Sequence, residues 1–87
     1  MMRESTRKRT AAAMQHYAGG DASGVAAYAC GPGWIHLRFH HGSAYRYDDT
    51  RPGAEHVHEM QRLADLGEGL NTYVNRYVRD NYARRLE

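Results

Sequence analysis

The strongest pattern along the chain is an alternation of apolar and polar side chains over residues 34–40. Successive side chains of a β-strand point to opposite faces of a sheet, so a period of two predicts a half-buried strand. This segment is therefore expected to bury one row of side chains and to present the other row on the opposite face. The apolar row is Ile35, Leu37 and Phe39, and the polar row is His36, Arg38 and His40.

Two further strands are predicted on either side of this segment. Residues 25–30 form a short apolar run, and residues 43–48 alternate, with Tyr45 and Tyr47 on one face. A Gly-Pro-Gly sequence and a His-Gly sequence separate the strands, and proline and glycine favour the backbone angles of tight turns. The pattern predicts a three-stranded antiparallel meander.

The loop between the second and third strands determines which side chains share a face. A three-residue loop with Gly42 in the left-handed conformation places Leu37 opposite Tyr45. A two-residue loop would place Arg46 and Asp48 opposite aliphatic residues, and we reject it because burying two charges costs several kcal/mol. The core face then carries Ile35, Leu37, Phe39, Tyr45 and Tyr47, and the open face carries Trp34, His36, Arg38, Ala44, Arg46 and Asp48.

Two helices are predicted after the strands. Thr50 or Asp49 can cap the first helix, Pro52 fits its opening turn, and Gly67 fits the left-handed position where helices commonly end. Asn71 is the expected N-cap of the second helix. Apolar residues at helical spacing support both. They are Val57, Met60, Leu63 and Ala64 in the first helix, then Leu70, Tyr73, Val74, Tyr77 and Val78, with Tyr82 extending the second.

The N-terminal residues 1–23 are predicted to form a basic arm, and residues 24–87 the folded domain. Alanine and methionine over residues 10–18 favour a short helix, and the alternative is that the arm is disordered. The predicted fold class is α+β. A three-stranded antiparallel meander is followed by two helices packed on one face, and an N-terminal arm or short helix precedes it.

Composition and charge narrow the class of protein. A chain of 87 residues with 41% hydrophobic and 25% charged residues is typical of one small globular domain. The net charge of +2 is mild, and the basic residues gather near the two ends. No apolar run approaches the roughly 18 residues of a membrane span, and no secretory stretch follows the basic start. The single cysteine, Cys30, excludes an internal disulfide, so we expect a cytoplasmic protein.

The core-face residues also form a motif around the second turn. It reads Ile35-x-Leu37-x-Phe39-x-x-Gly42-x-x-Tyr45-x-Tyr47, with Val25 and Tyr28 before it and Ala64-x-x-Gly67-x-x-Leu70-Asn71 after it. This motif resembles the KTSC domain, found at the C-terminus of some lysyl-tRNA synthetases and alone in small bacterial and phage proteins. The resemblance covers residues 25–82 and implies RNA binding without catalytic residues. The chain departs from the family at Leu70, where an aromatic is common, and in its basic N-terminal extension.

Aromatic and basic side chains on the open face indicate binding to RNA or another nucleic acid. An exposed tryptophan can stack on bases while arginines pair with phosphates, and basic residues of the arm and the last helix can contact further phosphates. Alternatively, the chain is a protein-interaction module, such as a phage-type inhibitor or adaptor of a host complex, because tryptophan and arginine are frequent at hot spots. Self-association through the same face is a third outcome. The candidate residues are Trp34, His36, Arg38, Arg46, Arg76, Arg79, Arg7, Lys8 and Arg9.

No pattern of residues indicates catalysis or a metal site. His56 and His58 lie two residues apart on a predicted helix, so they point about 200° apart and cannot share one ion. The serines lack a Gly-x-Ser-x-Gly context, and the glycine-rich stretches lack the phosphate-loop pattern. We therefore expect a binding module without catalytic activity, metal or other cofactor.

Overall fold

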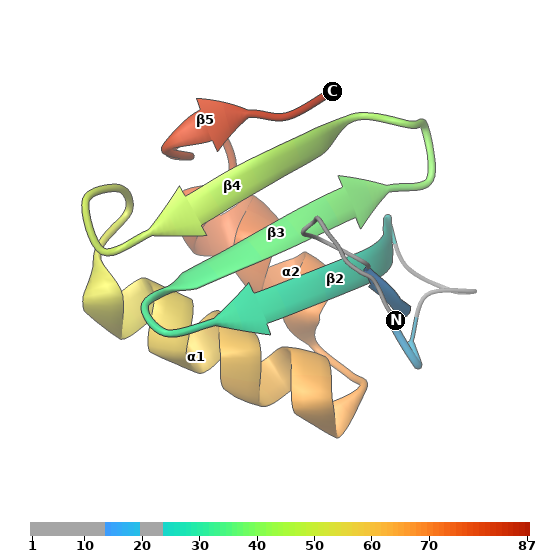
Figure 1. Cartoon of the computed structure of the whole chain (residues 1–87). Helices are drawn as coiled ribbons and strands as arrows, with labels where there is room; N and C mark the ends of the chain where they lie inside the picture. The colour runs from blue at the N-terminus through green and yellow to red at the C-terminus, as the bar shows by residue number, and fades with distance from the viewer. Residues whose placement is uncertain (1–13, 20–23) are drawn as a thin grey trace, which may run out of the picture.

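The computed structural model describes residues 14–19 and 24–87, which form an α+β fold with helices on one face of an antiparallel sheet (Figure 1). The α+β class is confirmed, but the predicted three-stranded sheet is wrong. The described residues form a five-stranded sheet in the order β1-β2-β3-β4-β5, because one short strand is added at each edge. The elements are β1 (Gln15–His16), β2 (Val25–Gly31), β3 (Trp34–Phe39), β4 (Ala44–Asp48), α1 (Ala54–Leu66), α2 (Leu70–Tyr73), the π-helical turn η4 (Val74–Val78) and β5 (Arg84–Arg85).

The central hairpin has the predicted register. Leu37 pairs with Tyr45, and Ile35 pairs with Tyr47. The backbone N–H of Phe39 donates to the Ser43 carbonyl at 2.9 Å, which closes a three-residue loop. Gly42 adopts a φ of 106°, a backbone conformation that residues other than glycine rarely adopt.

The core lies between this face of the sheet and the helices, as the alternation predicts. Tyr47 is 1% exposed, whereas Tyr45 and Phe39 are partly buried at the rim. The Tyr47 hydroxyl donates to the Arg79 carbonyl at 3.2 Å, so the buried ring has a polar partner. The aromatic residues of β4 therefore point toward the core, and Arg46 lies on the other face.

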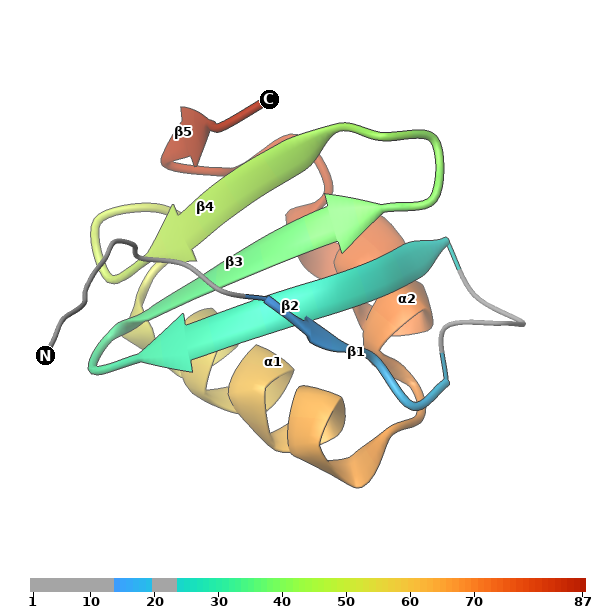
Figure 2. The same cartoon turned by 45° about the vertical axis from the view of Figure 1, so that its right-hand side comes forward.

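In the described part of the helix predicted over residues 10–18, the chain forms the strand β1 instead, and residues 10–13 lie outside the described residues. Gln15 pairs with Tyr28 and His16 with Ala27, which places β1 beside β2 (Figure 2). Helix propensity is a weak preference, and here the burial of Tyr17 outweighs it. Tyr17 is 1% exposed in the core, and its hydroxyl accepts the Leu70 backbone N–H at 3.1 Å.

The second helix ends before Tyr82, contrary to the prediction. The π-helical turn η4 closes with an Arg79 N–H to Val74 carbonyl bond of 2.7 Å, and the chain then returns to the sheet as β5. Tyr82 instead lies against Tyr45, with ring centroids 4.4 Å apart. The pairing of β5 satisfies backbone groups along β4 that an unpaired edge would leave open.

The predicted helix caps are only partly correct. Gly67 ends α1 with a φ of 82°, as expected. Gly53 precedes α1 in place of Thr50 or Asp49, and no side chain in the described ranges caps it. The Asp48 carboxylate accepts the Thr50 N–H at 3.0 Å, which tightens the preceding turn.

The start of the second helix also differs from the prediction. The helix α2 follows Gly69 and begins at Leu70. Asn71 lies inside the helix and is not its N-cap.

Candidate nucleic-acid interface

The open face is the sheet surface opposite the helices. His36, Arg46 and Arg84 lie side by side on it, because His36 pairs with Arg46 and Arg46 pairs with Arg84. In the part of the chain that the structure describes, no helix covers this surface (Figure 1). This face therefore carries a row of nitrogen-bearing side chains across three strands, β3, β4 and β5.

Trp34 lies next to this row. Its ring centroid is 4.5 Å from that of His36, and the Arg46 guanidinium carbon is 5.4 Å from the indole centroid. Gly31, which pairs with Trp34, leaves the space that the indole occupies. The tryptophan is thus held by the sheet, by His36 and by a cation–π contact.

Replacing Gly31 with alanine should displace the indole. A Cβ atom at this position would lie 2.3 Å from Cε2 of Trp34, far inside van der Waals contact. We expect a shifted tryptophan emission maximum and a loss of about 1–3 kcal/mol in the free energy of unfolding. Trp34 is the single tryptophan of the chain, so emission reports on this site alone. An unchanged spectrum would show that the ring does not rest on Gly31.

Two arginines of the open face are paired with carboxylates. The Arg46 Nε donates to Asp48 at 2.9 Å, and this hydrogen bond is the main reason that the Asp48 pKa is lowered. Arg38 donates two bonds to Glu87, at 2.6 and 2.9 Å. Arg84 makes no ion pair with any described residue. Of the three open-face arginines, Arg84 is the one whose charge no carboxylate of the described residues neutralises.

His36 is less accessible than the sequence indicates. It is 8% exposed, and its Nδ1 atom is buried without a hydrogen-bond partner among the described residues. Burial, with contributions from Arg46 and Arg84, lowers the His36 pKa below its ordinary value. The imidazole is therefore neutral at neutral pH. It adds no positive charge to the open face, and its role there is to contact Trp34 and Arg46. Ala44, also predicted on this face, is 1% exposed.

The structure brings only some of the candidate residues together. Trp34, His36 and Arg46 form one cluster, and Arg38 lies on the same face beside Glu87. Arg76 lies in η4, and Arg79 follows it, so both belong to the helical layer on the other side of the sheet. The remaining three, Arg7, Lys8 and Arg9, lie outside the described residues.

Arg84 is the open-face residue that the sequence pattern missed. Its position depends on β5, and a two-residue strand is too short to show any periodicity. The only available signal was the basic composition of the C-terminal stretch.

Three other features of the described residues bear on which classes of function are possible. Among the described residues, none of the helices has the length and apolar character needed to cross a membrane. Residues 14–19 and 24–87 contain no group of three or more His, Cys, Asp or Glu side chains placed to hold a metal ion. Cys30 is exposed, and desolvation together with Asp65 raises its thiol pKa to about 11, which disfavours the reactive thiolate.

Comparison with protein-family models, with curated proteins and with solved structures finds no match for this chain. The resemblance to the KTSC domain therefore stays a prediction.

Proposed function

We propose that this protein is a non-catalytic module that binds single-stranded RNA on the open face. The observation that carries the proposal is the position of Arg84 beside Arg46 and the tryptophan cluster. Aromatic side chains stack on unpaired bases, and neighbouring arginines bind the phosphates that connect them. The resemblance to the KTSC domain implies the same class of partner.

The charges on this face favour a polyanion. Three arginines, Arg38, Arg46 and Arg84, face two carboxylates, Asp48 and Glu87, among the described residues. The Arg38–Glu87 pair is well exposed, with side-chain exposures of 37% and 56%, so solvent screens it and a phosphate can replace the carboxylate at little cost. Arg84 provides the first contact because it has no described ion-pair partner.

RNA affinity should fall with salt and depend on Arg84. Three phosphate contacts predict a roughly 20-fold loss of affinity between 50 and 200 mM salt. Arg84→Ala removes one charged contact, which should weaken binding by about tenfold. Fluorescence anisotropy of a labelled single-stranded RNA of mixed sequence measures both effects.

The matched control is Arg62→Ala, which removes the same charge from α1 on the helical layer. We expect its RNA affinity to equal that of the unaltered protein. Equal losses for Arg62→Ala and Arg84→Ala would indicate general attraction to charge and contradict a binding site on the open face. Absence of binding at 50 mM salt would reject the RNA proposal.

A protein partner is the second candidate, and an aromatic pair on the helical layer favours it. Tyr77 is 55% exposed, and its ring lies 4.8 Å from that of Tyr73. Exposed tyrosines are frequent anchors of protein interfaces. A single protein recovered by affinity purification after nuclease treatment, and lost with Tyr77→Ala, would support this candidate.

A further inference from the structure

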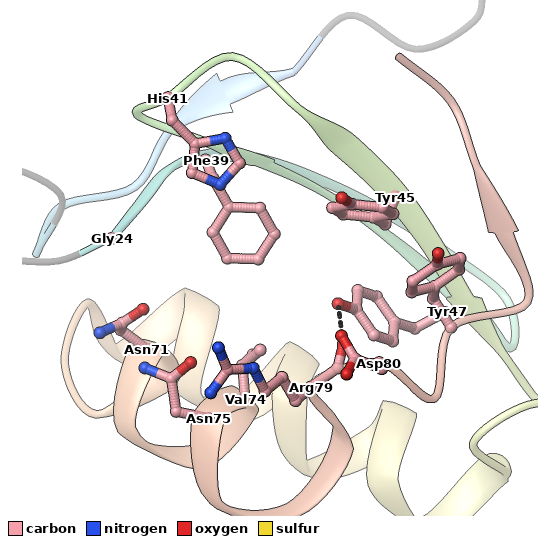
Figure 3. A pocket seen from close by; sticks show the side chains of 11 residues that line it. Gly24, Phe39, His41, Tyr45, Tyr47, Asn71, Val74, Asn75, Arg79 and Asp80 are labelled. Carbon is pink, nitrogen blue, oxygen red and sulfur yellow. Dashed lines mark hydrogen bonds between the residues drawn. The ribbon is translucent and has the colours of Figure 1, made fainter.

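A pocket lies at the rim of the core, between one end of the sheet and the second helix (Figure 3). Its volume is about 380 Å³, at the small end of the range of ligand sites. Phe39 and Tyr45 approach it from the sheet, and Asn75 and Arg79 approach it from the helix. The pocket is on the helical side of the sheet, so it is separate from the open face.

Aromatic rings form the sheet side of the pocket. The centroids of Phe39 and Tyr45 are 5.9 Å apart, and Tyr82 continues the wall at 4.4 Å from Tyr45. His41 stacks on Phe39 at 5.7 Å with an interplanar angle of 6°, which holds the phenyl ring in place. The planes of Phe39 and Tyr45 differ by 61°, so a planar ligand can stack on one of these rings while the other ring meets its edge.

Polar side chains form the opposite side. Asn75 and Arg79 lie four residues apart, and neither side chain has a hydrogen bond or ion pair to any residue in the described ranges. The Arg79 backbone carbonyl accepts a hydrogen bond from the Tyr47 hydroxyl (Figure 3). This bond fixes the backbone of the turn and leaves the Arg79 guanidinium available. The amide of Asn75 can therefore contact a base edge while the guanidinium of Arg79 contacts an anion.

The charge around the pocket favours an anionic ligand. Arg79 lines it, and the Arg85 guanidinium, which is not among the lining groups, lies 5.9 Å from the centroid of the Tyr45 ring. Asp80 is the opposing carboxylate among the described lining residues. Arg79 and Asp80 balance each other in the described lining, and Arg85 beside Tyr45 adds a further positive charge close by. This excess of positive charge disfavours a quaternary ammonium ligand, although aromatic walls can also bind such cations.

We propose that this pocket binds one nucleotide, with its base stacked on Phe39, the edge of the base against Tyr45, and its phosphate at Arg79. The flat base of a nucleotide can stack on the aromatic side of the pocket, and its phosphate can pair with the positively charged guanidinium of Arg79. The proposal does not rest on RNA binding by the open face, because it uses none of the same side chains.

The test is a titration of the ¹⁵N-labelled protein with adenosine monophosphate, followed by two-dimensional NMR. We expect saturable shifts of the Phe39, Tyr45 and Asn75 amides at millimolar nucleotide. Adenosine alone and inorganic phosphate alone should each bind more weakly than the nucleotide. Choline serves as the cationic probe and should not shift these signals.

Two substitutions assign the site. Arg79→Gln should weaken nucleotide binding by about tenfold, since a charge-assisted bond is lost, while Arg62→Gln on α1 should leave it unchanged. Arg84→Ala should weaken RNA binding by the open face but leave nucleotide binding intact, so the two proposals fail independently. Absence of shifts at millimolar nucleotide, shifts confined to the surroundings of Trp34, or binding of choline in its place would overturn the assignment.

Discussion

Replacing Tyr47 with alanine is expected to lower the free energy of unfolding by about 3–5 kcal/mol, as buried aromatic truncations do. The side chain is 1% exposed, packs edge-to-face with Tyr82 at 6.4 Å and donates a hydrogen bond to the Arg79 carbonyl. The alanine variant would lose this burial and leave a cavity between β4 and the second helix. Urea denaturation followed by far-ultraviolet circular dichroism measures the change.

Two further variants separate the causes of this loss. Tyr47→Phe removes the hydroxyl alone and should cost about 1 kcal/mol. Tyr77→Ala makes the same chemical change at a tyrosine that is 55% exposed, and it should cost no more than about 1 kcal/mol. Similar losses for Tyr47→Ala and Tyr77→Ala would contradict the orientation of β4 on which both proposed sites depend.

The second large effect is expected at Tyr17. Tyr17→Ala should destabilise the protein by about 3–5 kcal/mol, because a fully buried ring is removed from the core. Tyr17→Phe keeps the ring but leaves the Leu70 N–H without its acceptor, and a buried unsatisfied donor costs about 1–3 kcal/mol. Urea denaturation measures both losses.

Hydrogen exchange gives the Tyr17 prediction a local readout. The Leu70 amide should exchange faster in Tyr17→Phe than in the unaltered protein, whereas the Tyr73 amide, bonded to Gly69, should change less. If Tyr17→Ala unfolds at the same urea concentration as the unaltered protein, the segment containing β1 does not contribute to the core.

The sequence predicts the middle of the sheet because side-chain alternation and turn residues agree there. Leu37 and Tyr45 each follow a period of two, and Gly42 fits the loop between them, so one register satisfies burial and turn geometry together. The edge strands could not be predicted, since two residues carry no period. Their position depends on tertiary contacts, such as burial of Tyr17 and stacking of Tyr82 on Tyr45.

The candidate sites also divide into a part that strand periodicity predicts and a part that depends on tertiary contacts. Trp34, His36 and Arg46 share a face through strand periodicity, so the sequence brings them together correctly. Arg84 joins them only through β5, and the nucleotide pocket combines side chains from β3, β4, η4 and the C-terminal segment. No local pattern relates residues so far apart in the chain, and the folded core alone brings them together.

The wide turn at η4 also has an evolutionary consequence. A π-helical turn holds one residue more than an α-helical turn, and such insertions frequently persist where a side chain must be redirected. Loss of one residue between Val74 and Val78 would turn the bond between the Arg79 N–H and the Val74 carbonyl into an ordinary α-helical bond, so the residues after the turn would keep their orientation. Arg79 would then still face the aromatic wall, whereas the side chains inside the turn, including Asn75, would be redistributed. Relatives with a regular helix here would therefore keep the phosphate contact but lose the present position of the Asn75 amide.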